Sequence, residues 1–183
     1  MLKRFFVLFV ALVSLFSSTT FAGERYLLNS GDVLDISVWN EDSLQKQVTV
    51  LPDGVITFPL AGEVIAKDKT VAEVEEELTK KLSEYLADPV VTVSVTNVEG
   101  NRVHILGKVL NPGSFVMNQP LDAMQALSLA GGLSPYAEEN NIIVLRRDGT
   151  KQQVLAVKYA EIKKGKALNT NITLESGDVI IVP

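Results

Sequence analysis

The chain has 183 residues, of which 46% are hydrophobic and 21% are charged, a composition typical of a folded globular protein. It contains no cysteine and a single histidine, which excludes disulfides, thiolate metal sites and any site built on several histidines. Seventeen basic and 22 acidic residues give a net charge of −5, which argues against a nucleic-acid-binding protein.

The first 22 residues have the pattern of a secretory signal peptide. Two basic residues precede an apolar run over 5–16, and a small-x-small motif ends at Ala22. The run has 12 residues, fewer than the roughly 20 that span a bilayer, so we favour a cleaved signal over a retained anchor. Cleavage between Ala22 and Gly23 would leave 15 basic and 22 acidic residues, a net charge of −7.

The pattern from Tyr26 to Asn97 predicts a first module, built of several strands and one helix. Apolar residues at 34, 36 and 38 alternate with polar ones, which predicts a half-buried strand. Asp53-Gly54 predicts a hairpin between strands at 48–51 and 55–58. We expect further strands at 63–65 and 91–96.

The helix between these strands is predicted from spacings of three and four between apolar residues. Thr70 and Glu73 have the spacing of a capping box, and Asp88-Pro89 ends the pattern. The expected apolar stripe is Val71, Val74, Leu78, Leu82 and Tyr85 or Leu86.

A module boundary is predicted at 98–101, followed by a hairpin, a helix and further strands. We expect a short helix with Pro120 in its first turn and Gly131-Gly132 as its left-handed cap. The expected strands are 103–109, 114–117, 142–146, 154–157 and 179–182. This order is that of a β-grasp domain, so the predicted fold class is α+β.

The tetrapeptide Ser-Gly-Asp-Val occurs at 30–33 and again at 176–179, each time before an apolar strand. We interpret it as one turn used twice, in which aspartate makes local hydrogen bonds, and not as a duplicated domain.

The residues predict no catalytic, cofactor-binding or metal-binding site. His104 lies in a strand pattern, and no local motif gives it a nucleophile or an acid partner. The glycines form no phosphate loop. A carboxylate pair for glycoside hydrolysis depends on spacing in the fold and stays open as an alternative.

A ligand-contact site is predicted only as a set of candidates. Arg146 and Arg147 can form an anion clamp or simply end a strand before the Asp148-Gly149 turn. Tyr136 can stack on a sugar ring, as can Trp39, although a tryptophan at a strand end is more typical of a core or an interface. Exposed polar tips are expected at 134–140 and 147–149.

Two ordered sets of residues resemble known bacterial domains. The first set resembles the opening of the polysaccharide export domain: Tyr26-x-Leu28-x-x-Gly31-Asp32-x-Leu34-x-Ile36-x-Val38-Trp39, Val50-x-Pro52-Asp53-Gly54-x-Ile56, Phe58-Pro59-Leu60-x-Gly62 and Asp88-Pro89-x-Val91-x-Val93. The second resembles the soluble-ligand-binding β-grasp (SLBB) domain: Leu106-Gly107-x-Val109, Pro112-Gly113-Ser114-Phe115, Ala126-Leu127-x-x-Ala130-Gly131-Gly132 and Gly177-Asp178-Val179-Ile180-x-Val182-Pro183.

This resemblance to the bacterial polysaccharide export family implies that the signal peptide at 1–22 is followed by a small mixed export domain at 23–98 and a β-grasp-like domain at 102–183. It also implies a non-enzymatic role in exporting capsular, biofilm or other extracellular polysaccharide across the outer membrane. The partners it implies are the polysaccharide, an inner-membrane polysaccharide co-polymerase and further copies of the chain.

The sequence departs from the larger members in having no lipidated cysteine, one β-grasp module and no membrane-spanning helix after Val182-Pro183. We therefore expect a short periplasmic member, associated with the outer membrane through a separate outer-membrane barrel. The alternative is a monomeric periplasmic carbohydrate-binding module, for which one tryptophan and four tyrosines offer few stacking platforms.

Overall fold

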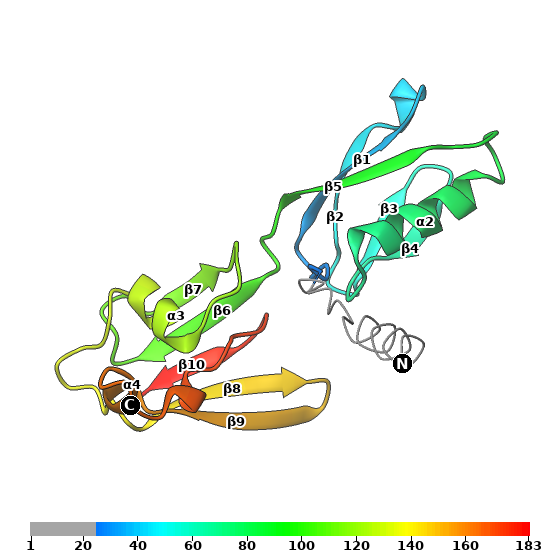
Figure 1. Cartoon of the computed structure of the whole chain (residues 1–183). Helices are drawn as coiled ribbons and strands as arrows, with labels where there is room; N and C mark the ends of the chain where they lie inside the picture. Colours follow the sequence, from blue (N-terminus) through cyan, green and yellow to red (C-terminus); the bar gives the residue numbers. More distant parts are fainter. Residues whose placement is uncertain (1–24) are drawn as a thin grey trace, which may run out of the picture.

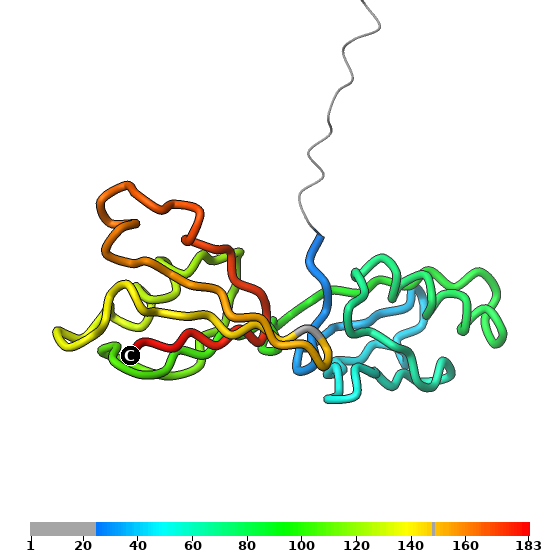
Figure 2. The backbone as a smooth tube through the Cα atoms, turned by 90° about the horizontal axis from the view of Figure 1, so that it is seen from below, coloured from blue at the N-terminus to red at the C-terminus, as the bar shows by residue number. Residues whose placement is uncertain are grey.

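The structure is a computed structural model that describes residues 25–183, so the predicted signal peptide and the cleavage site at Ala22 and Gly23 lie outside the described residues. The described chain forms two lobes joined by one connecting segment (Figures 1 and 2). Each lobe has its own hydrophobic core, the first built from residues between Leu28 and Val93 and the second from residues between Val103 and Val182. The predicted α+β class is confirmed.

The first lobe contains an antiparallel sheet in the order β2-β1-β5, formed by β1 (Val33–Val38), β2 (Lys46–Thr49) and β5 (Val91–Asn97). The alternation predicted for β1 is confirmed, because every second residue, from Leu34 to Val38, is buried in the core. A short 3-10 helix, η1 (Asp42–Leu44), connects β1 to β2 and buries Leu44.

The hairpin predicted around Asp53-Gly54 is wrong in its pairing. A turn is present, with the Gly54 N–H donating to the Leu51 carbonyl at 2.8 Å. However, β3 (Val55–Phe58) pairs with β4 (Gly62–Ile65), while β2 pairs with β1. The apolar residues Ile56, Phe58 and Val64 give β3 and β4 a shared buried side, which a pairing with the largely exposed β2 would not provide.

Helix α2 (Val71–Leu82) confirms the predicted stripe and its cap. Val74, Leu78 and Leu82 are buried, and Thr70 and Glu73 form a reciprocal capping box. The helix packs against β4 and β5. It ends before the predicted stop, and of the two stripe candidates beyond it Leu86 packs on the core whereas Tyr85 is exposed.

The second lobe is a mixed five-stranded sheet in the order β7-β6-β10-β8-β9. Its strands are β6 (Arg102–Gly107), β7 (Gly113–Val116), β8 (Ile142–Asp148), β9 (Lys151–Val157) and β10 (Val179–Val182). The C-terminal strand β10 lies in the centre, parallel to β6 and antiparallel to β8. A central parallel pair flanked by antiparallel strands is consistent with the predicted β-grasp arrangement.

Helix α3 (Ala123–Leu129) covers one side of this sheet, with Ala126 and Leu127 fully buried. The prediction that Pro120 lies in its first turn is wrong: the helix starts after Asp122, whose side chain forms a capping box with Gln125. Gly131 and Gly132 have φ angles of 81° and 91°, which confirms the left-handed end. The short elements α4 (Tyr159–Ile162) and η2 (Leu168–Thr170) were not predicted.

Candidate functional site

Two buried aspartates each accept several hydrogen bonds, and these are the main polar sites in the described part of the fold. Among the described residues, the buried polar or charged side chains are Asp32 and Asp178, 0% and 1% exposed. In both Ser-Gly-Asp-Val turns the aspartate carboxylate accepts from the backbone N–H three residues earlier, at 2.8 Å from Asn29 and 2.9 Å from Glu175. The interpretation of one turn used twice is therefore confirmed.

The Asp32 carboxylate also binds a tyrosine and the segment between the lobes. It accepts from the Tyr26 hydroxyl at 2.6 Å and from the Gly100 N–H at 3.0 Å. Burial, reinforced by the hydrogen bond to Asp32, raises the pKa of Tyr26 well above its ordinary value. Tyr26 therefore stays a neutral donor, which satisfies the buried carboxylate.

The Asp178 carboxylate holds Arg146, one of the predicted contact residues. Arg146 donates from Nε and Nη2 to the two carboxylate oxygens at 3.0 and 2.7 Å. It also donates to the Thr173 carbonyl at 2.9 Å and pairs with Glu175. The hydrogen bonds to Asp178 raise the pKa of Arg146 further, so the guanidinium is a permanent cation engaged inside its own lobe.

The two turns meet on Gly100, in the segment that joins the lobes. The Gly100 N–H donates to Asp32, and its carbonyl accepts from the Ser176 hydroxyl at 3.0 Å. The Gly177 N–H donates to the Arg102 carbonyl at 2.7 Å, two residues further on. We call this arrangement the Gly100 clasp, because one turn from each lobe binds the same peptide segment.

The other predicted contact residues are solvent-exposed and lie in separate places. Tyr136, 82% exposed, lies in the loop after α3, where its N–H donates to the Ser134 hydroxyl. Arg147 is exposed on β8. Trp39, 81% exposed, follows β1 in the other lobe, so it is not a core residue. The structure brings no two of these side chains into a shared pocket among the described residues.

His104 has a partner that the sequence did not reveal. Its Nδ1 lies 2.7 Å from the Ser114 hydroxyl, on the neighbouring strand β7 and directly opposite in register. Within residues 25–183, no carboxylate makes a hydrogen bond to the imidazole to orient it. A serine and a histidine on an open sheet face without an orienting acid are not an assembled triad.

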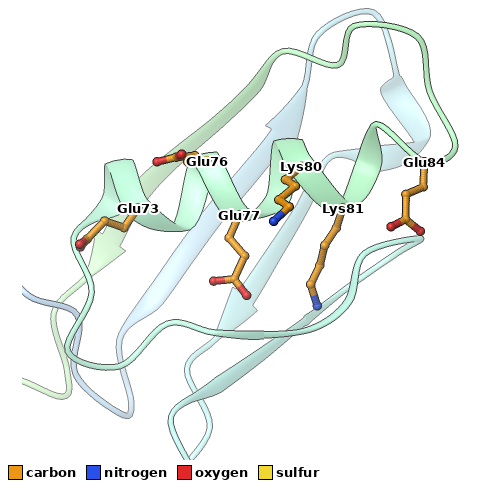
Figure 3. Close-up of a pocket in the computed structure, with 6 residues that line it drawn as sticks. All are labelled: Glu73, Glu76, Glu77, Lys80, Lys81 and Glu84. Atoms are coloured by element: carbon orange, nitrogen blue, oxygen red, sulfur yellow. The ribbon is translucent and has the colours of Figure 1, made fainter.

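A shallow hollow of about 520 Å³ runs along the solvent side of α2. Four glutamates and two lysines line it: Glu73, Glu76, Glu77, Lys80, Lys81 and Glu84 (Figure 3). Glu77 pairs with Lys69, and Lys81 donates to the Glu63 carbonyl. These are the solvated charges on the exposed face of an amphipathic helix.

Within the described part of the chain, no group of three or more His, Asp or Glu side chains is arranged to hold a metal ion. None of the helices between residues 25 and 183 combines the length and the apolar character needed to cross a membrane.

Comparison with known families divides the chain at the same place as the two cores. Residues 22–96 match the family described as "Polysaccharide biosynthesis/export protein", and residues 101–182 match the SLBB domain. The clasp residue Gly100 lies between the two matched segments.

Curated relatives match the chain across both segments. The EPS I polysaccharide export outer membrane protein EpsA of Ralstonia nicotianae is 30% identical over 181 residues, covering 86% of this chain and 47% of the relative. The capsule polysaccharide export protein BexD of Haemophilus influenzae is 26% identical over 177 residues, covering 84% of this chain and 42% of the relative. The polysialic acid transport protein KpsD of Escherichia coli is 27% identical over 158 residues, covering 86% of this chain and 28% of the relative. The chain thus spans less than half the length of these relatives.

Proposed function

Because the chain belongs to the bacterial polysaccharide export family, with one polysaccharide export domain and one SLBB domain, we propose that it is a periplasmic component of a machinery exporting capsular or extracellular polysaccharide across the outer membrane. The observation that carries this proposal is the ordered pair of matches at 22–96 and 101–182, in a chain whose relatives bear export names. On this proposal the domains extend over 23–98 and 102–183.

The role that we propose is transport without catalysis. The buried carboxylates are satisfied by structural donors, and the His104–Ser114 pair lies on an open sheet without an orienting carboxylate among the described residues. The cargo is a polysaccharide, and the mature net charge of −7 means that an acidic polymer must be held by shape and local hydrogen bonds.

The partners in this proposal are those of an export pathway. An inner-membrane polysaccharide co-polymerase supplies the polymer, a separate outer-membrane barrel receives it, and several copies of this chain assemble between them. The family resemblance supports these partners, and the exposed aromatic and apolar residues Trp39, Tyr85 and Tyr136 give the chain surface suited to contacts.

For direct contact with polymer we keep Tyr136 and Arg147 as candidates, because both side chains are free to meet solvent. Arg146 is better assigned to the stability of the second lobe, because Asp178, Glu175 and Thr173 already occupy its donors.

The proposal is tested by deleting the gene from the organism that encodes it and measuring extracellular polysaccharide. We expect the polymer outside the cells to fall severalfold, and a plasmid copy carrying residues 1–183 to restore it. A copy lacking residues 1–22 should fail, because the protein would not leave the cytoplasm.

The experiment has one matched control variant and one result that would contradict the proposal. The Asp53→Asn variant, altered in an exposed turn, should restore export as well as the wild type does. Unchanged extracellular polysaccharide in the deletion strain, measured under conditions in which the protein is detected in the parent strain, would contradict the proposal.

A further inference from the structure

The five-stranded sheet of the second lobe has two apolar faces, of which α3 covers one. The residues that α3 covers, such as Val103, Ile105 and Ile180, are fully buried. Because side chains alternate along a strand, the residues between them point to the opposite face. We call that face the outer sheet face; its apolar residues are Leu106, Val116, Ile143, Leu145, Val154, Ala156, Val179 and Ile181.

No described element packs on the outer sheet face. None of its eight apolar residues belongs to either hydrophobic core or to the side chains packed against a core. Leu106 is 50% exposed and Val154 is 62% exposed. The four central residues are half-buried, shielded by their neighbours in the sheet. A contiguous apolar area of this kind on an exported protein marks an interaction surface.

The first lobe provides an internal comparison. The outward positions of its three-stranded sheet include Asp35, Ser37 and Gln47 on β1 and β2, and Thr92 and Ser94 on β5. That is the ordinary solvated face of an antiparallel sheet. The same chain therefore gives one sheet a polar outer face and the other an apolar one.

The outer sheet face carries basic side chains at its strand positions. Its ionisable residues are Arg102 and His104 on β6 and Arg147 on β8, and none of its strand positions carries a carboxylate. Glu99, from the segment between the lobes, pairs with Arg102, and Arg147 is exposed. In a chain with more acidic than basic residues, this composition is complementary to an apolar segment that carries acid groups.

We propose that the outer sheet face binds an acidic amphipathic helix of a partner protein. A helix is the element that covers the other face of this sheet, and helix-on-sheet packing buries the apolar stripe of one element on the other. In the bound state the apolar stripe of the partner helix packs on Leu145, Val154 and Ile181, and the carboxylates of that helix form ion pairs with Arg147.

The charge pattern argues against the other occupants. Two outer sheet faces packed on each other would collect Arg102 and Arg147 from both copies with no strand carboxylate to pair Arg147. An anionic membrane is repelled by a mature chain of net charge −7. Helix α2 of a second copy is acidic, but its apolar stripe is already buried in its own lobe.

The test uses the mature chain, residues 23–183, and two labelled synthetic helical peptides of about 18 residues. Both peptides carry the same leucine stripe, flanked by glutamates in one and by lysines in its twin. We expect fluorescence anisotropy to show binding of the glutamate peptide, weakening with salt, and little binding of the lysine twin.

Two exposed positions test the assignment without disturbing the core. Val154→Glu and Arg147→Glu should each weaken binding of the glutamate peptide at least tenfold. The matched control Ser94→Glu, on the polar sheet face of the first lobe, should leave it unchanged. Circular dichroism melting of all three variants checks that each one is folded.

The proposal is overturned if the glutamate peptide does not bind, if the lysine twin binds equally well, or if Val154→Glu leaves binding unchanged. Light scattering and co-sedimentation with phosphatidylglycerol vesicles complete the comparison. Self-association abolished by Val154→Glu would make the occupant a second copy, and vesicle binding abolished by it would make the occupant a membrane; either result rejects a partner helix.

Discussion

Asp178 is the residue whose buried charge most depends on its partners. Its carboxylate is 1% exposed and holds both Arg146 and the Glu175 N–H. Asp178→Ala would leave a partly buried guanidinium and a turn N–H without their main acceptor. We expect it to lower the free energy of unfolding by about 3 kcal/mol, measured by urea denaturation.

Glu175→Ala is the matched control for this prediction. It removes the other carboxylate that pairs with Arg146, but that side chain is 65% exposed. An exposed ion pair contributes little, so we expect a loss below about 1 kcal/mol. Equal losses in the two variants would mean that the burial of Asp178 is not what makes its contact with Arg146 important.

Glu73 gives the first lobe a dependence on pH. Its pKa lies below the ordinary value of 4.5 because the backbone N–H and the hydroxyl of Thr70 donate to its carboxylate. A carboxyl with a lowered folded-state pKa stabilises the fold above its ordinary pKa, and the contribution is lost as pH falls through the lowered value.

We therefore expect Glu73→Gln to be less stable than the wild type at pH 7, and the difference in melting temperature to shrink as the pH is lowered below about 4.5. Thermal melts at a series of pH values measure this difference. Glu76→Gln, on the solvent face of the same helix, should show no such convergence. A Glu73→Gln deficit that stays constant with pH would refute the role of the Glu73 charge.

Local sequence predicted the residue-scale features whose partners lie within a few positions. The capping box joins Thr70 to Glu73, and each turn aspartate binds the N–H three residues earlier. The partner of Arg146 is 32 positions away and that of His104 is ten positions away on another strand. Those contacts follow from the register of the sheet, which single residues do not encode.

The Gly100 clasp makes a prediction at the scale of elements. A Cβ built on Gly100 would lie 2.4 Å from the Ser30 carbonyl oxygen and 2.8 Å from the Asn29 Cβ. Gly100→Ala must therefore displace the turn of the first lobe, and we expect a loss of about 1–3 kcal/mol in calorimetry. We also expect a larger radius of gyration in small-angle X-ray scattering, because the connecting segment loses its hydrogen bonds.

Gly113→Ala is the control, since nothing lies within 4 Å of a Cβ built there and the residue has no left-handed φ angle. Its stability and radius of gyration should match the wild type. A Gly100→Ala variant indistinguishable from Gly113→Ala would mean that the clasp does not restrain the segment between the lobes.

Elements were predictable where the pattern is periodic and failed where partner choice matters. The alternation of β1 and the stripe of α2 were found because burial repeats at their own periods. The Asp53-Gly54 signal is local and predicts that the strands on either side of it pair with each other. In the structure β2 pairs with β1 and β3 pairs with β4, and the local signal does not contain this choice of partner. The sequence suggests Pro120 as a first-turn residue of α3 because proline favours that position, but the helix starts after its N-cap Asp122, two residues later.

At the scale of the whole molecule, the sequence indicated two modules but not the outer sheet face. A signal for it was present: Ile142–Leu145 and Val179–Val182 are continuous apolar runs, the pattern of strands covered on both faces. The strand order places these two runs next to each other and next to β6. Only this order shows that their outward-facing apolar residues form one surface.

On the proposed function, this chain serves the export of polysaccharide and not its synthesis. Export and synthesis are distinguished by the partition of radiolabelled polymer between cells and medium after a pulse of labelled sugar, in the deletion strain and its parent. We predict that total labelled polymer is made in the deletion strain but stays cell-associated, in a fraction released by osmotic shock. If total polymer instead falls in step with the extracellular fraction, the chain acts in synthesis and the export account is contradicted.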